Sequence, residues 1–222
     1  GWRDERIVNS CKTLIQAVGC APESEKHGSV YAYGSYWLSK HCSDGRIPAV
    51  PHMVNLPSVD DDMRQHLGIP ADAVVFGRNG GTDTWNLPFA DSVLRNILDY
   101  RKDIYFLFQN TPISFSHKNI IHLPPTSNLY FKTKFINTCD AMIHARKRGE
   151  TFGLAISEFS IKNKPVLTYA NSPEKAHLDI LKNQAILYKN EKDLTELLLN
   201  HSFMQLEVYN AYQQFEPAQV MD

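Results

Sequence analysis

Apolar residues recur along this chain at two spacings, and the spacing changes near residue 73. Residues 4–18 carry apolar side chains three and four positions apart and stop at Gly19, which predicts one amphipathic helix. Residues 31–40 form an aromatic stretch that ends in a short predicted helix. Residues 47–57 contain three prolines, which favour an extended connector over a helix.

From residue 73 onward, short apolar runs alternate with segments of helical periodicity. Strands that are apolar along their whole length are typical of a parallel sheet covered by helices on both faces. The pattern predicts a doubly wound α/β domain over residues 61–222, preceded by a helical and linker segment at 1–60. The predicted strands are 73–77, 104–108, 119–122, 141–144, 165–169 and 185–188, and the predicted helices are 88–100, 129–138, 152–161, 173–182, 192–199 and 203–215.

Composition and charge narrow the classes of function. The 222 residues, 43% of them hydrophobic, suffice for one large domain with some excess. The chain has 23 Lys and Arg against 24 Asp and Glu, which excludes a generally basic nucleic-acid-binding surface. The longest apolar run, residues 104–108, is far shorter than the ~20 residues of a membrane helix. We expect no membrane span and no nucleic-acid partner.

The four cysteines are sparse and lack a Cys-x-x-Cys spacing. Cys11, Cys20, Cys42 and Cys139 are therefore expected to be unpaired, as in a reducing compartment. No His lies three or four positions from a Cys or another His, so no zinc site is expected. The residues after the charged start also lack a signal-peptide pattern, and we predict a cytoplasmic protein.

The loop after the first predicted strand has features of a phosphate-binding loop. It reads GRNGGTDTWN, where Gly80 and Gly81 permit close approach of a ligand and Arg78 offers a planar, permanently charged fork. It matches neither the G-x-G-x-x-G pattern nor a P-loop. Because Gly-Gly is also a common turn dipeptide, an ordinary surface turn is the alternative.

A second polar segment, ARKRGETFGLAISEF, follows the predicted strand 141–144. Glu150 stands just before a predicted helix, and Glu158 lies about two turns further along it. Carboxylates at these positions can accept hydrogen bonds from vicinal sugar hydroxyls. Ligands of doubly wound sheets bind outside the carboxyl ends of the strands, where both loops lie. The alternative is that the glutamates complement the helix dipole or face solvent.

The flanking residues add donors and positive charge to the same place. The backbone N–H groups of Thr151, Phe152 and Gly153 open the predicted helix and suit a diphosphate or a sugar hydroxyl. The run Arg146, Lys147 and Arg148 is basic. These groups therefore favour an anionic ligand, although the basic run is also compatible with a plain surface.

Other residues leave two interpretations open. His144 ends a predicted strand beside the loop and suits either a ligand contact or a structural role, whereas for His177 the structural role is favoured. The aromatic side chains near the N-terminus are expected to pack on the sheet domain, although exposed Tyr and Trp also stack on sugar rings; they are Tyr31, Tyr33, Tyr36 and Trp37.

The segment GETFGLAISEF…KPV resembles the hallmark of the C-terminal, donor-binding domain of retaining GT-B glycosyltransferases of the group 1 type: a Glu, seven residues, a second Glu and then Pro-Val. VVFGRN, IYFLFQN and RIPAVPHMVNLPS are similar to that family's Gly-Arg strand, its next strand and its interdomain linker. The resemblance implies a Rossmann-like domain that binds a nucleotide-diphosphate sugar. It further implies transfer of the sugar to a glycan or other acceptor, with retention and without a metal or cofactor.

The resemblance also assigns roles by position. Glu150 would be the catalytic residue that holds hydroxyls of the donor sugar, Glu158 would bind the ribose, and Arg78 would bind the β-phosphate. The residues predicted to bind the nucleotide sugar are Arg78, Asn79, Gly80, Gly81, His144, Arg146, Arg148, Thr151, Phe152, Gly153 and Glu158.

Two features depart from the family pattern. Asp83 stands where the family usually has a Lys, and we hypothesise that Arg146 or Arg148 replaces it. Only about fifty residues precede the linker, so a further domain or chain is expected to supply the acceptor site. Two alternatives remain open: a non-catalytic or degenerate nucleotide-sugar-binding module, and a GT-B-like nucleotide-sugar epimerase.

Overall fold

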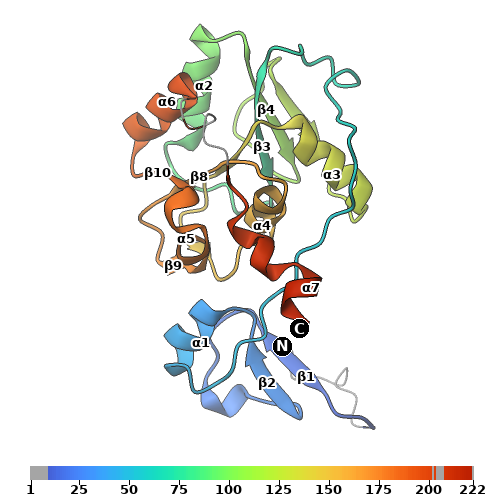
Figure 1. The fold of residues 1–222 in the computed structure, drawn as a ribbon. Helices are drawn as coiled ribbons and strands as arrows, with labels where there is room; N and C mark the ends of the chain where they lie inside the picture. Colours follow the sequence, from blue (N-terminus) through green and yellow to red (C-terminus); the bar gives the residue numbers. More distant parts are fainter. Residues whose placement is uncertain (1–9, 202, 204–207, 222) are drawn as a thin grey trace.

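The computed structural model describes residues 10–201, 203 and 208–221, which form a small N-terminal unit and a larger α/β domain (Figure 1). The N-terminal unit contains strands β1 (Leu14–Ala17) and β2 (Val30–Tyr33), which pair in parallel, and helix α1 (Tyr36–Ser43). Its core consists of Ala17, Tyr33, Leu38 and Ile47. No helix of the described residues is long and apolar enough to cross a membrane.

The N-terminal unit differs from the sequence prediction in two ways. Residues 14–17 of the expected helix 4–18 form strand β1, because the short apolar run pairs with β2; residues 4–9 lie outside the described residues. Cys20 and Cys42 form a disulfide, so the expectation of four unpaired cysteines was wrong for these two. Their pairing removes the support that free cysteines gave to a reducing compartment, and cytoplasmic location stays a prediction.

The α/β domain is built on six parallel strands in the order β10-β8-β6-β3-β4-β5. The expected doubly wound parallel sheet is thereby confirmed. The strands are β3 (Val74–Asn79), β4 (Ile104–Gln109), β5 (Ile120–Leu123), β6 (Ala141–His144), β8 (Val166–Tyr169) and β10 (Ala185–Tyr188). The helices are α2 (Ala90–Tyr100), α3 (Leu129–Thr138), α4 (Leu154–Ile161), α5 (Ala176–Leu181), α6 (Glu191–Asn200) and α7 (Pro217–Val220), with 3₁₀ helices at Lys182–Gln184 and Ala211–Phe215. A further 3₁₀ helix, Glu23–Glu25, lies between β1 and β2 in the N-terminal unit.

Helices cover both faces of the sheet because successive strand residues point to opposite sides. In β3, Phe76 packs in a core with α2 and α6, whereas its neighbour Val75 packs in a second core with α3 and α4. Leu107 of β4 joins the second core, while Phe106 and Phe108 join the first. The inner strands β3, β4, β6 and β8 are therefore buried along most of their length, whereas the edge strands β5 and β10 are partly exposed.

Two predicted helices are shorter than expected. The expected helix 173–182 begins with strand β9 (Glu174–Lys175), which pairs in parallel with β7 (Gly149–Glu150), and only then turns into α5. Of the expected helix 203–215, the described part contains the 3₁₀ helix at Ala211–Phe215. Pairing between distant segments thus holds residues 174 and 175 extended against the local helical pattern.

The proline-rich connector is extended, as its sequence indicated, and it is fixed to both parts of the molecule. Ala49 bridges to Tyr33 of β2, and the Val54 N–H donates to the Phe215 carbonyl at 2.9 Å. Val54, Leu56 and Met63 are buried against the second core. In Figure 1 the C-terminal helix α7 reaches the junction between the two units. The domain boundary placed at residue 60 stays a prediction.

The strand order reverses between β3 and β6: the chain moves outward through β4 and β5, then returns to the other side of β3. Such a reversal leaves a crevice beyond the carboxyl ends of the two central strands. The loops after Asn79 and after His144 therefore emerge side by side.

Replacing Gly77 by Ala is expected to destabilise the fold. A Cβ at this central position of β3 would collide with the Cys139 side chain and with the Phe159 ring, so the core must shift. We expect the free energy of unfolding to fall by about 1–3 kcal/mol in urea titrations. Gly19→Ala is the control, because a Cβ added at Gly19 would meet no atom within 4 Å. Equal stability of the two variants would contradict this packing.

Candidate functional site

One cavity of about 440 Å³ opens beyond the carboxyl ends of β3 and β6. It brings together residues of the two predicted loops that are about seventy positions apart in the sequence. Ten of the twelve predicted site residues line it: Arg78, Asn79, Gly80, Gly81, Arg146, Glu150, Thr151, Phe152, Gly153 and Glu158. Their assigned roles stay predictions.

Arg78 forms the floor of this cavity. Its side chain is almost fully buried, and its Nη2 donates to the carbonyl and the hydroxyl of Thr84 at 3.1 and 2.7 Å. Burial lowers the pKa of Arg78 to about 10, so the guanidinium keeps its charge at neutral pH. Its Nε has no hydrogen-bond partner among the described residues. Arg78 thus carries a buried charge with unused donor capacity.

Gly80 makes room for that guanidinium. A Cβ at Gly80 would lie 2.6 Å from Nη2 of Arg78 and 2.8 Å from its Cζ. Asn110 anchors the loop by donating from Nδ2 to the Gly80 carbonyl at 2.9 Å. Gly80 therefore serves close packing around Arg78, which distinguishes this loop from an ordinary surface turn.

Glu150 is held from two sides. Its Oε1 lies 3.2 Å from Nε2 of His144, and its Oε2 accepts from Nη1 of Arg146 at 2.7 Å. Burial raises the pKa of Glu150, but the His144 hydrogen bond and the charges of Arg146 and Arg78 outweigh burial, so the net pKa is lowered. Glu150 is therefore an ionised acceptor and not a general acid at neutral pH.

A chain of hydrogen bonds behind Glu150 fixes the proton positions on two histidines. Burial lowers the pKa of His144, so its ring is neutral, and Nε2 must carry the proton that faces the carboxylate. Its Nδ1 then accepts from the Thr168 hydroxyl at 2.9 Å, and that oxygen accepts from Nε2 of His177 at 3.2 Å. This assignment leaves Nδ1 of His177 without a proton, and that atom has no hydrogen-bond partner among the described residues.

Glu158 lies across the cavity in a different setting. Its Oε1 accepts from Nζ of Lys132 at 2.6 Å, and its Oε2 accepts from Nδ2 of Asn79 at 3.1 Å. Burial raises the pKa of Glu158, and the Lys132 and Asn79 contacts only partly oppose that effect. The two glutamates of the motif therefore differ in their surroundings, and their pKa values are shifted in opposite directions.

The backbone on both sides of Glu150 is shaped by two glycines at the edge of the cavity. Gly149 has φ 79°, and a Cβ there would collide with the Glu174 carbonyl, so only glycine lets β7 approach β9. Gly153 has φ 92° and caps α4 in the left-handed conformation. The Thr151 hydroxyl donates to the Val18 carbonyl at 3.1 Å and joins this loop to the end of β1.

Two predicted residues lie outside the cavity. His144 is fully buried behind Glu150, where it contacts that carboxylate and not the open space. Arg148 points away and pairs with Glu174 at 2.8 Å, with 69% of its side chain exposed. Of the two arginines proposed to replace the missing Lys, only Arg146 is therefore in place.

Sequence reasoning missed several residues that line the cavity, among them Lys132, His52 and Val18. Lys132 stands on the predicted helix 129–138 without any local motif, and only the packing of α3 beside α4 brings it to Glu158. The charged side chains on the cavity wall are three cations, Arg78, Lys132 and Arg146, and two anions, Glu150 and Glu158, so the net charge is 3 − 2 = +1. An anionic ligand suits this balance.

No group of three or more His, Cys, Asp and Glu side chains in the described part of the chain is placed to hold a metal ion. Cations for a bound anion are instead supplied by the side chains named above. The absence of a metal or cofactor requirement stays a prediction.

No protein-family model and no curated protein matches the sequence, but the structure is similar to solved glycosyltransferases. HepE of Anabaena, in complex with UDP and glucose, matches with a TM-score of 0.68 at 13% identity over 93% of this chain and 68% of that one. TarM matches with 0.64 at 10% identity, over 96% and 49%. WaaG, a glycosyltransferase of lipopolysaccharide biosynthesis, matches with 0.61 at 15% identity, over 86% and 59%.

These likenesses show that the chain has a GT-B glycosyltransferase fold, as the resemblance implied. The chain spans 49–68% of the length of these three proteins. The matches cover 86–96% of this chain.

The setting of Glu150 predicts how its carboxyl group titrates. In Arg146→Met the carboxylate loses its ion-pair partner, so the pKa of Glu150 should rise toward its ordinary value of 4.5. Carbon-13 NMR of the glutamate carboxyl groups measures this shift. Arg148→Met is the control because Arg148 pairs with Glu174 instead, and a shift of equal size in both variants would contradict the assignment.

The lowered pKa of Glu150 also determines how its contribution to stability changes with pH. Glu150 stabilises the fold fully above its unfolded pKa, and that contribution is lost as the pH falls through the lower folded pKa.

Proposed function

We propose that this chain is the donor-binding part of a glycosyltransferase, which binds a nucleotide-diphosphate sugar and transfers the sugar to a glycan or other acceptor. One observation carries the proposal: the two motif glutamates line a single net-positive cavity at the strand-order reversal, together with the buried Arg78 at the end of β3. HepE, whose fold is similar, was solved with UDP and with UDP-glucose. UDP is therefore the first nucleotide to test.

The cations of the cavity would hold the diphosphate. Arg78 has a free Nε donor, Arg146 borders the sugar side beside Glu150, and the first backbone N–H groups of α4 add an oriented dipole. Lys132 supplies the ammonium that the loop lacks at Asp83. These groups are fixed before the ligand arrives, so they stabilise the leaving diphosphate without reorganisation and without a metal.

The two glutamates would take different parts of the donor. Glu158 lies between Lys132 and Asn79 and would accept hydrogen bonds from the ribose hydroxyls. Glu150, held as a carboxylate by His144 and Arg146, would accept from hydroxyls of the sugar and place negative charge near the carbon that becomes electron-poor as the bond to phosphate breaks. Retention of configuration is part of this proposal.

The acceptor would approach from the side of the N-terminal unit, where Val18 and His52 border the cavity. Because the chain spans only part of its structural neighbours, a further domain or chain would complete the acceptor site. A binding module without catalysis is the alternative, and it would bind UDP while turning over no UDP-sugar when the product mixture is analysed.

Glu158→Ala tests the ribose contact. Loss of a carboxylate that accepts two hydroxyl hydrogen bonds should weaken UDP binding by about tenfold or more in isothermal titration calorimetry. Glu196→Ala removes an exposed carboxylate of α6 remote from the cavity and serves as the control. An unchanged UDP affinity in Glu158→Ala would remove the proposed nucleotide site.

Lys132→Met tests whether Lys132 is the diphosphate cation. The variant should bind UDP about tenfold more weakly, because a charge-assisted contact is lost, and should bind uridine with unchanged affinity. Lys134→Met is a matched control on the same helix, since Lys134 pairs with Asp61 at the surface. Equal losses for UDP and uridine would show that Lys132 acts only by holding Glu158.

A further inference from the structure

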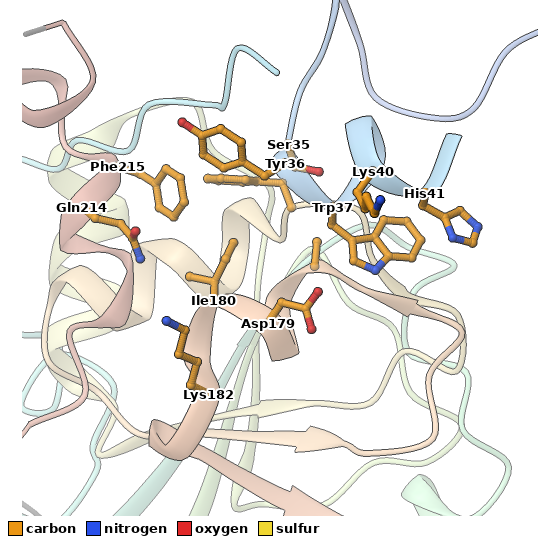
Figure 2. Close-up of a pocket in the computed structure, with 12 residues that line it drawn as sticks. Ser35, Tyr36, Trp37, Lys40, His41, Asp179, Ile180, Lys182, Gln214 and Phe215 are labelled. Atoms are coloured by element: carbon orange, nitrogen blue, oxygen red, sulfur yellow. The ribbon is translucent and has the colours of Figure 1, made fainter. Parts of the chain in front are cut away.

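A second cavity, of about 500 Å³, lies between helix α1 of the N-terminal unit and helix α5 of the α/β domain (Figure 2). The side chain of Phe152 lines both this cavity and the one beside Glu150. Phe152 is almost fully buried and packs against His52, Tyr212 and Phe215. The two cavities are therefore adjacent and share the buried Phe152 in their lining.

Aromatic faces form much of the wall of the second cavity. Figure 2 shows Tyr36 and Phe215 on one side of it and Trp37 on the other. Tyr36 is 65% exposed, and the Trp37 ring is stacked on His41 with centroids 4.5 Å apart and planes inclined by 13°. Packing of the N-terminal segment alone does not explain so exposed a tyrosine. Flat aromatic faces of this kind stack on the apolar faces of sugar rings.

Polar groups alternate with these rings. Asp179 and Lys182 lie along the floor in Figure 2, below Tyr36 and Trp37. In the part of the chain that the structure describes, the Asp179 carboxylate, the Lys182 ammonium, the Tyr36 hydroxyl and the Trp37 N–H form no hydrogen bond or ion pair within the protein. The wall therefore offers both acceptors and donors to a ligand that carries several hydroxyl groups.

Lys182 also has an unfavourable backbone conformation. Its φ of 50° and ψ of −123° belong to a region that glycine occupies readily and other residues rarely do. The residue ends α5 and places its side chain at the cavity. A lysine at this position therefore brings an ammonium group to the cavity where the backbone conformation alone would favour glycine.

We propose that this second cavity binds sugar units of the acceptor, which makes the acceptor a saccharide. This inference rests on the proposed function, because it places the acceptor chain across Phe152 from the donor sugar. Stacking faces, a carboxylate and two kinds of donor within a concave space of this volume suit a polyhydroxylated ring with apolar faces. An apolar peptide would leave Asp179 and Lys182 buried without partners.

The test uses the full chain on a printed array of defined oligosaccharides, with and without UDP. Wild type should retain a subset of the saccharides, and Tyr36→Ala/Asp179→Ala should lose at least tenfold in affinity for them while its UDP affinity is unchanged. Both side chains are exposed, so the fold should be preserved. The matched control, Asp99→Ala/Tyr100→Ala, removes an exposed Asp and an exposed Tyr from α2, outside the cavity lining.

The variant Lys182→Gly provides a second, independent test. Glycine relieves the backbone conformation and removes the ammonium, so the melting temperature should rise while saccharide binding weakens. The proposal would be overturned if the wild-type chain bound no saccharide on the array, or if the cavity variants bound saccharides as well as the wild type does. Saccharide binding that depends on Tyr36 and Asp179 in a chain that does not bind UDP would instead support this cavity and refute the proposed donor site.

Discussion

The arrangement of this site depends on a positive charge buried at the end of the central strand. Arg78 lies almost wholly inside the protein, and an isolated guanidinium there would be costly. Three surrounding features offset that cost. Thr84 accepts two hydrogen bonds from Arg78, and Gly80 leaves space for the guanidinium. The carboxylate of Glu150 lies near enough to favour the charged form of Arg78. Among the described residues nothing accepts from its Nε, so part of the donor capacity of the guanidinium is unused.

The two motif glutamates show how position in the fold sets chemical character. Both are largely buried, which alone would raise both pKa values. For Glu150 a buried histidine and Arg146 reverse that effect, whereas for Glu158 one lysine and one amide do not. The same residue type therefore becomes an ionised carboxylate beside His144 and Arg146 and a more readily protonated one beside Lys132.

Local sequence predicted the α/β domain well because its inner strands are buried on both faces, and the short apolar runs that result alternate with longer segments of helical periodicity. The run Ala141–His144 was predicted with its observed bounds. Prediction failed where pairing with a distant segment decided the conformation. Residues 14–17 have helical spacing but pair with β2, and residues 174 and 175 extend because they pair with Gly149 and Glu150.

The sequence by itself determined the sheet class, the loops at its edge and most of the residues that line the cavity, because these are coded by short-range patterns and by two glutamates eight positions apart. Only the tertiary structure decided that Lys132 enters the cavity, that Arg148 leaves it, that Cys20 and Cys42 pair, and that a second cavity adjoins the first at Phe152. The physical reason is that side-chain direction and proximity across the fold depend on packing between elements, and such packing has no signature in the local order of residues.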